Sequence, residues 1–156
     1  LYKKYLGDKA DQLPQASLLY PLNVTPEGKS QAVVRTILNI NNEDQSMILA
    51  GEVPENAKVQ LMMASVDAIA EGASQAAMLA MQNRINHPQL ALLVSCVGRK
   101  LVMNQRVEEE IEHVQEIIGN KVAITGFYSY GEMAPFRENT FCELHNQTMT
   151  LTLISE

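Results

Sequence analysis

The residues best suited to chemistry lie in the last third of the chain, inside segments that otherwise have the composition of core strands. Residues 126–132 are GFYSYGE and residues 142–148 are CELHNQT. Buried polar groups cost free energy unless protein groups, water or a ligand satisfy their hydrogen bonds. A cluster of such groups is therefore a candidate site for a small polar ligand. The candidate ligand-binding residues in these segments are Gly126, Tyr128, Tyr130, Glu132, Glu143, His145 and Gln147.

The alternation of side chains along a strand predicts that these candidates share one face. Strands are expected at 121–132 and 142–154, and their apolar core positions have the same parity as the polar candidates. If the two strands pair as neighbours, the polar side chains gather beyond an apolar floor. A β-bulge between 142 and 148 would reverse part of this assignment. The predicted register pairs Leu153 with Val122, Leu151 with Ile124, Met149 with Gly126, Gln147 with Tyr128, His145 with Tyr130 and Glu143 with Glu132.

Two interpretations of this cluster remain open. Tyrosine, histidine and glutamate side chains can satisfy one another at the open end of a sheet without any ligand. Alternatively, an apolar floor with convergent polar walls is the usual design of a small-molecule site. Gly126 and Gly131 favour the second interpretation, because a glycine in a strand leaves room for close approach of a ligand or of another backbone.

A second candidate segment, 95–99, ends the most continuous apolar run of the chain. Ligands gather beyond the carboxyl ends of strands in open α/β sheets, and Arg99 could hold a carboxylate or phosphate through its planar guanidinium group. Cys96 is either a small buried apolar residue or a ligand contact. A Cys96–His145 nucleophile–base pair is a further alternative without a local motif. Cys96 and Arg99 therefore join the ligand-binding candidates.

No metal site is predicted. His87 precedes a proline in a loop and His113 lies among glutamates, so both are expected at the surface. The histidines lack the spacing of zinc or iron ligands. Two cysteines are too few for a disulfide scaffold. Cys96 and Cys142 are expected to be separate thiols, and a single bridge between them is the alternative.

The elements that would position these residues begin with a helix and a small antiparallel sheet. Residues 1–14 predict an amphipathic helix that ends near Pro14. The proline in 18–22 indicates an edge strand or an extended lead-in. Two apolar runs separated by turn-forming residues predict a β-hairpin, and a third run adds a strand. These three strands are expected at 32–40, 46–50 and 58–63.

The remaining sequence predicts helices packed on a sheet. The alanine-rich segment 66–84, with Ser65 as N-cap, is expected to be helical. The apolar run 90–96 predicts a central strand buried on both faces, followed by a loop at Gly98. The expected fold is a single α+β domain, with a mixed, mainly antiparallel sheet of about six strands and helices packed on it. A last helix is expected at 104–118, with Val107, Ile111, Val114 and Ile118 inside and Glu108, Glu109, Glu110, Glu112 and Glu116 in solvent.

The charge and the apolar composition of the chain indicate which classes of partner to expect. Twelve basic against eighteen acidic residues give a net charge of −6, whereas nucleic-acid-binding surfaces are basic. No apolar run approaches the roughly 20 residues that span a bilayer, and no segment has the composition of a signal peptide. We therefore expect no nucleic-acid or membrane partner. Because the chain begins with Leu1, we also expect it to be part of a longer protein.

These segments together resemble the C-terminal domain of the FIST family of sensory domains. The resemblance covers nearly the whole chain and indicates one FIST C-terminal-like domain over 1–156. Its most specific parts are the last two segments. The matching segments are LYKKYLG at 1–7, VRTI at 34–37, VQLM at 59–62, SCVGR at 95–99, GFYSYGE at 126–132 and CELHNQTMT at 142–150.

The resemblance implies a non-enzymatic, cytoplasmic signal-input domain that binds a small ligand, with amino acids as the favoured class. Arg99 would suit the carboxylate of an amino acid, and Glu132 or Glu143 its ammonium group. A FIST N-terminal domain, absent from this chain, is implied as a partner, with an output such as a histidine kinase, a diguanylate cyclase or a chemotaxis module. The alternatives are a haem-dependent nitric oxide sensor with His145 or Cys96 as axial ligand, a Cys96-dependent enzyme, and an interaction module without a ligand.

Overall fold

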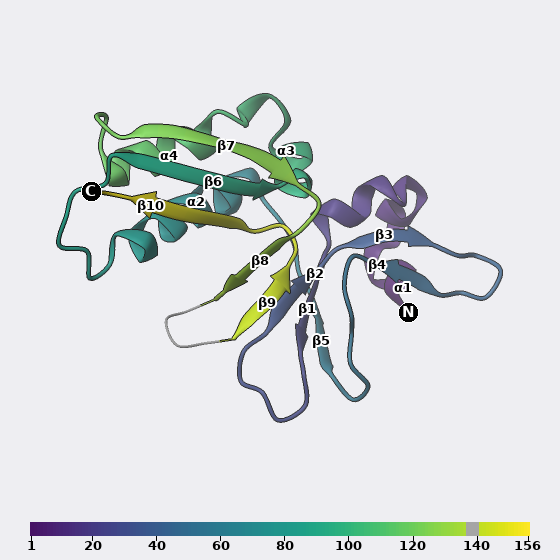
Figure 1. Cartoon of the computed structure of the whole chain (residues 1–156). Coiled ribbons are helices and arrows are strands. Elements are labelled where there is room, and N and C mark those ends of the chain that lie inside the picture. Colours follow the sequence, from purple (N-terminus) through teal and green to yellow (C-terminus); the bar gives the residue numbers. More distant parts are fainter. Residues whose placement is uncertain (137–140) are drawn as a thin grey trace. The chain divides into compact units, whose positions relative to one another are not determined.

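The computed structural model describes residues 1–136 and 141–156. Its internal contacts divide the chain into two compact units, Leu1–Ala64 and Ser65–Glu156, which are described separately (Figure 1). The predicted α+β class is confirmed, because the described residues form four α-helices and ten short strands. These strands lie in four small sheets. All but one of the described strand pairings are antiparallel.

The first unit contains a three-stranded sheet and a hairpin. Its strands are β1 (Leu22–Thr25), β2 (Val33–Arg35), β3 (Ile37–Ile40), β4 (Met47–Leu49) and β5 (Lys58–Leu61). The predicted hairpin is confirmed as β3 and β4. Strand β1 is central, between β2 and β5, so of the two alternatives predicted for 18–22 the edge strand is wrong. Pro21 lies just before β1, and every residue of the strand therefore keeps an N–H group for pairing.

The N-terminal helix of this unit is shorter than predicted. Helix α1 (Tyr2–Leu6) ends at Gly7, whose φ of 55° lies in the left-handed region that terminates helices. Two 3₁₀ helices follow, η1 (Gly7–Gln12) and η2 (Gln15–Leu19). The core of the unit joins α1 to the strands through Tyr2, Leu6, Leu22, Val24, Val33 and Ile37.

The second unit carries helices on a three-stranded sheet. Its helices are α2 (Val66–Met81), α3 (Val97–Met103), the 3₁₀ helix η3 (Asn104–Arg106) and α4 (Glu109–Ile118). Its strands are β6 (Leu90–Cys96), β7 (Ala123–Ser129), β8 (Glu132–Pro135), β9 (Cys142–His145) and β10 (Met149–Ile154). The predicted N-cap of α2 is confirmed, since the Ser65 hydroxyl oxygen accepts from Ala68 N at 3.2 Å. The predicted loop at Gly98 is wrong, because α3 begins directly after β6.

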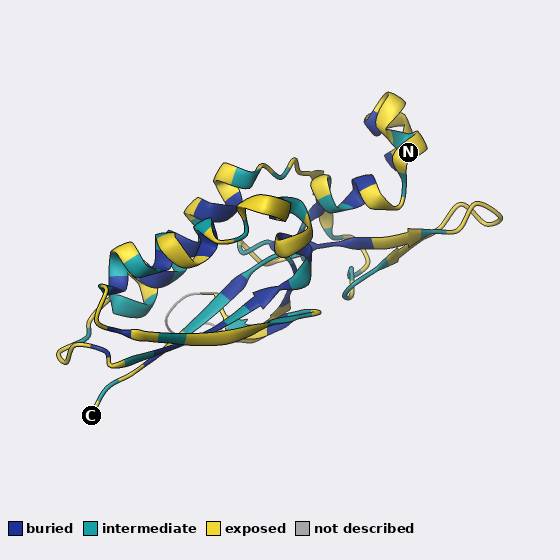
Figure 2. Cartoon of the chain, turned by 90° about the horizontal axis from the view of Figure 1, so that it is seen from above, coloured by how far each residue is buried: buried dark blue, intermediate teal, exposed yellow. Residues whose placement is uncertain are grey.

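The core of this unit lies between the sheet and helices α2 and α4, which cover one face (Figures 1 and 2). Alternate β6 side chains, Ala91 and Leu93, are buried against the helices, whereas Leu92 and Val94 on the opposite face are half-buried. The prediction of a central strand is confirmed, but its burial is complete on one face only. Each fully buried Val, Leu or Ile side chain stabilises the fold by about 1.5–3 kcal/mol. The remaining core residues are Ala73, Ala77, Val114, Ile118, Val122, Met149 and Leu153.

The predicted pairing of the two end strands is wrong. Strand β6 lies between them, antiparallel to β10 and parallel to β7. Thus Leu153 lies opposite Ala91 rather than Val122. Each end segment also splits into two strands, and β8 pairs with β9, which places His145 opposite Glu132. The break before β10 includes Gln147, whose φ of 54° departs from strand geometry.

Candidate functional site

The polar candidates are concentrated where β6 and β7 end. These strands are parallel and their last residues, Cys96 and Ser129, lie opposite each other. Helices α3 and α4 form the connection between the strands, so this edge is the kind of strand end where ligands bind in α/β structures. Two clusters of buried polar groups occupy it.

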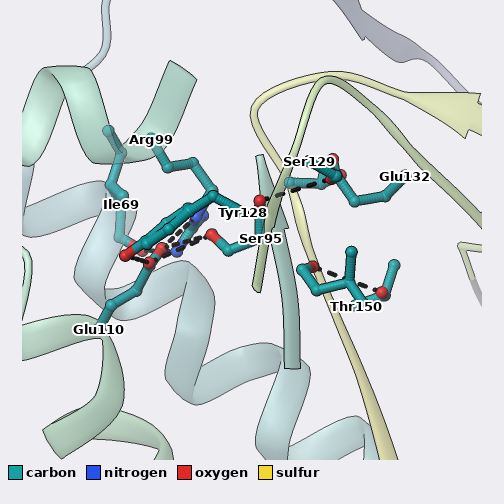
Figure 3. A network of polar contacts seen from close by, with 10 residues as sticks. Ile69, Ser95, Arg99, Glu110, Tyr128, Ser129, Glu132 and Thr150 are labelled. Carbon is teal, nitrogen blue, oxygen red and sulfur yellow. Dashed lines mark hydrogen bonds and ion pairs between the residues drawn. The ribbon is translucent and has the colours of Figure 1, made fainter. Parts of the chain in front are cut away.

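The first cluster is centred on Glu110, which is fully buried. Its carboxylate accepts hydrogen bonds from the Ser95 hydroxyl at 3.1 Å and from the Tyr128 hydroxyl at 3.2 Å. Arg99 Nε donates to the same carboxylate and forms an ion pair with it. Figure 3 shows these three side chains converging on Glu110 from β6, α3 and β7.

Arg99 is held at both ends of its guanidinium group. Besides the ion pair with Glu110, its Nη2 donates to the Ile69 carbonyl oxygen of α2 at 2.8 Å. Only 4% of Arg99 is exposed, so the pair lies in a region of low dielectric constant. Removing one partner of such a pair leaves a buried charge uncompensated and costs about 3–5 kcal/mol.

Tyr128 has a perturbed phenol in this cluster. Burial, followed by the negative charge of Glu110, raises the pKa of Tyr128 from 10.0 to about 12. Lys100 lies over its ring, with Nζ 4.9 Å from the ring centroid, a cation–π arrangement. The phenol therefore stays protonated and donates to Glu110 at neutral pH.

The second cluster is centred on Glu132, of which 2% is exposed. Its Oε1 accepts from the Ser129 hydroxyl at 2.5 Å and its Oε2 from the Thr148 hydroxyl at 2.7 Å. Figure 3 shows Ser129 and Glu132 directed toward each other. The carboxylate thus ties the end of β7 and the segment before β10 to the start of β8.

His145 lies beside this second cluster on the β8–β9 hairpin. It is opposite Glu132 in the strand register and is 4% exposed. Its Nε2 lies 2.9 Å from the Ala134 carbonyl oxygen, within hydrogen-bond distance. The Phe136 ring packs near the imidazole, with centroids 5.8 Å apart.

Cys96 is a buried thiol at the same edge. Burial is the largest cause that raises the pKa of Cys96, and the Glu132 charge adds to it. A raised pKa keeps the sulfur protonated, and the thiol is a much weaker nucleophile and metal ligand than the thiolate. Cys142 is exposed on β9.

The remaining candidates are more exposed than the two glutamates at the centres of the clusters. Tyr130 is 92% exposed, and Glu143 lies opposite Ala134 and is half-buried. Gln147 is half-buried in the segment between β9 and β10. Gly126 is required by the neighbouring strand, because a Cβ atom there would lie 2.0 Å from the Leu93 carbonyl oxygen.

Glu110 is predicted on the solvated side of its helix, but it is fully buried and forms the centre of the first cluster. Glu110 lies four residues before Val114 and eight before Ile118, and all three are buried. That spacing is the signal that could have identified it. Ile111, expected inside, is 39% exposed.

His113 also departs from the expected surface role, since its Nδ1 lies 2.9 Å from the Ser74 hydroxyl oxygen. The helix face containing Glu110 and His113 therefore contacts the protein interior more than predicted.

The proposed haem ligands do not fit this arrangement. The His145 Nε2 already interacts with Ala134, and Cys96 is favoured as a neutral thiol. Among the residues that the structure describes, no group of three or more His, Cys, Asp or Glu side chains could hold a metal ion. Within the same residues, no helix has the length and apolar character to cross a membrane.

Comparison with protein families gives one match. The model of the FIST C domain matches residues 1–135, which covers most of the 156 residues. Comparisons with curated proteins and with solved structures find no match. The chain therefore belongs to the FIST C domain family, a family of sensory domains in signal transduction.

Proposed function

We propose that this sensory domain binds a small amino acid ligand at the carboxyl ends of β6 and β7. The observation that carries the proposal is the gathering of four ionisable side chains there, each at most 4% exposed. They are Arg99, Glu110, Glu132 and His145. Burying such groups is costly unless their interactions are specific.

The same geometry favours sensing over catalysis. Burial holds Cys96 as a neutral thiol, which argues against a nucleophile. The Tyr128 phenol is likewise protonated and serves as a hydrogen-bond donor. Groups with fixed protonation states are suited to recognising a ligand rather than to exchanging protons with it.

The proposal extends to the context of the domain. We assign residues 1–156 to one cytoplasmic signal-input domain that works with a FIST N-terminal domain. Its output would be a histidine kinase, a diguanylate cyclase or a chemotaxis module. These assignments rest on the family to which the chain belongs.

Thermal unfolding in the presence of each of the twenty common amino acids tests the proposal. A ligand at a hundred times its Kd stabilises the folded state by about 2.7 kcal/mol, which raises Tm by several degrees. We expect stabilisation by at least one amino acid, and loss of that effect in Glu132→Gln. The matched control, Glu116→Gln, changes an exposed glutamate on α4 and should keep it. Failure of every amino acid to stabilise the protein would overturn the proposal.

A further inference from the structure

The charges at the candidate site are unequally compensated. Arg99 and Glu110 form a buried ion pair, and their charges cancel. Arg99 also donates to the Ile69 carbonyl. A ligand carboxylate that bound to Arg99 would have to displace Glu110, which is fully buried. Because that displacement would strand a charge away from water, Arg99 is a poor receptor for an anion.

Glu132 presents the opposite situation. Its carboxylate is buried, and it accepts hydrogen bonds from two neutral hydroxyls, those of Ser129 and Thr148. Among the described residues, no lysine, arginine or histidine forms an ion pair with it. A buried carboxylate without a cation is stabilised by a positively charged group that enters its surroundings.

Glu132 also retains the capacity to accept hydrogen bonds. Each carboxylate oxygen has two lone pairs, and each accepts one hydroxyl hydrogen bond here. An ammonium group has three N–H donors, and the lone pairs that the two hydroxyls leave unused are acceptors of the kind it needs. Ser129 and Thr148 are only half-buried, so the groups around this carboxylate extend to the surface.

We infer that the site recognises its ligand through an ammonium group that binds Glu132, and that it takes primary amines whether or not they carry a carboxylate. The inference rests on the proposed function, because it concerns the same site. We assign the binding of the ammonium group to Glu132 rather than to Glu143, which is half-buried beside Ala134. Glu132, rather than Arg99, is then the group that determines which ligands bind.

Calorimetric titration with matched compounds tests this inference. The first set is alanine, ethylamine and propanoate. The second is leucine, 3-methylbutylamine and 4-methylpentanoate, and the third is phenylalanine, 2-phenylethylamine and 3-phenylpropanoate. In a set whose amino acid binds, we expect the Kd of the amine to lie within about tenfold of the Kd of the amino acid. The acid should bind at least about tenfold more weakly than the amine, because it lacks the charged hydrogen bond to Glu132.

The variants separate the two carboxylates. Glu132→Gln keeps the shape of the side chain and should weaken amine binding by about tenfold or more, whereas Glu143→Gln should leave it unchanged. Thermal unfolding of both variants shows whether each remains folded. If Glu132→Gln does not fold, Ser129→Ala and Thr148→Val replace it, because each removes one hydroxyl donor that positions the carboxylate.

The outcomes distinguish this inference from the proposed function. If an amino acid and its acid bind while the amine does not, the domain is an amino acid sensor but the inference is wrong. If amine binding survives Glu132→Gln in a folded variant, the inference is also overturned. If no compound of any set binds and no amino acid raises Tm, the proposed function fails, and the inference fails with it.

Discussion

At the scale of single residues, the environment of Glu110 differs most from its sequence context. It belongs to a run of glutamates, yet it is fully buried and accepts hydrogen bonds from three side chains. A run of like charges normally indicates a solvated face, and here one position turns inward because the helix period aligns it with Val114. The ion pair with Arg99 offsets the free-energy cost of burying the Glu110 charge.

We expect Glu110→Ala to lower the free energy of unfolding by about 3–5 kcal/mol, because it leaves Arg99 buried without a partner. Urea denaturation followed by circular dichroism measures the change. Glu116→Ala, on the exposed side of the same helix, should stay within about 0.5 kcal/mol of the native protein.

The double variant Arg99→Met with Glu110→Leu gives a further check. It removes both charges, so it should be less destabilised than the sum of the two single variants. Additive effects of the two changes would show that the pair does not interact as the structure indicates.

At the scale of secondary-structure elements, the sequence predicts some boundaries well. Helix α2 begins at its serine cap, the β3–β4 hairpin surrounds a polar turn, and β6 is a central strand. These elements carry their signals locally, in a cap, in turn-forming residues or in a continuous apolar run. Local signals of this kind are readable without knowledge of the partner elements.

The end segments carry no such signal. The chain leaves the sheet after Ser129 and returns at Met149, and the intervening hairpin has the same alternating composition as the strands. Side-chain parity does not continue across the two breaks, so the predicted pairing partners of His145 and Glu143 are wrong. The structure nevertheless brings Arg99, Tyr128 and Glu132 to one edge of the sheet, because each lies close in sequence to the carboxyl end of β6 or β7.

Gly126 tests the pairing of β6 with β7. We expect Gly126→Ala to destabilise the protein by about 1–3 kcal/mol or more, as overpacking does, because its Cβ would lie 2.0 Å from the Leu93 carbonyl oxygen. Thermal unfolding and urea denaturation both measure this loss.

The matched control for this change is Gly72→Ala in the interior of α2. The nearest atom to a Cβ there is Arg99 Nη1 at 3.4 Å, an ordinary contact, so we expect stabilisation by about 0.5–1 kcal/mol. Equal effects of the two substitutions would contradict the strand pairing at Gly126.

At the scale of the whole molecule, each of the two units contains a tyrosine whose pKa is raised to about 12. In the first unit, burial is the main cause for Tyr2, which donates to the Tyr20 carbonyl oxygen at 2.8 Å. In the second unit the residue is Tyr128, where burial is again the main cause. Both phenols therefore bind their protons more tightly in the folded chain than in the unfolded chain.

This difference predicts a loss of stability at alkaline pH. Below pH 10 both states keep the phenol proton, so the stability is independent of it. Between pH 10 and about 12 the unfolded chain loses the proton first, and the free energy of unfolding falls as pH rises.

Urea denaturation at a series of pH values measures the slope. Tyr2→Phe and Tyr128→Phe should each make the alkaline decline shallower. Tyr5→Phe, which changes a tyrosine that is 70% exposed, should leave it unaltered. A decline that is the same in all three variants would contradict the assignment.

The family match ends at residue 135, yet the second unit needs the residues that follow. Strand β10 covers one edge of β6, and its Met149 and Leu153 complete the core. Thr148 also donates to Glu132. The candidate site therefore joins the matched part of the chain to the part beyond it.

The central position of β6 also has a consequence for biosynthesis. Its partner β10 lies at the other end of the unit, and Thr150 contacts Val94 across 56 positions of the sequence. Contacts of such long sequence separation form slowly, because a large loop must close first. While the chain is still on the ribosome, β6 has an unpaired edge until the last strand emerges. The sheet is therefore expected to be completed late, after β10 has been synthesised, and the exposed edge of β6 is prone to aggregation until then.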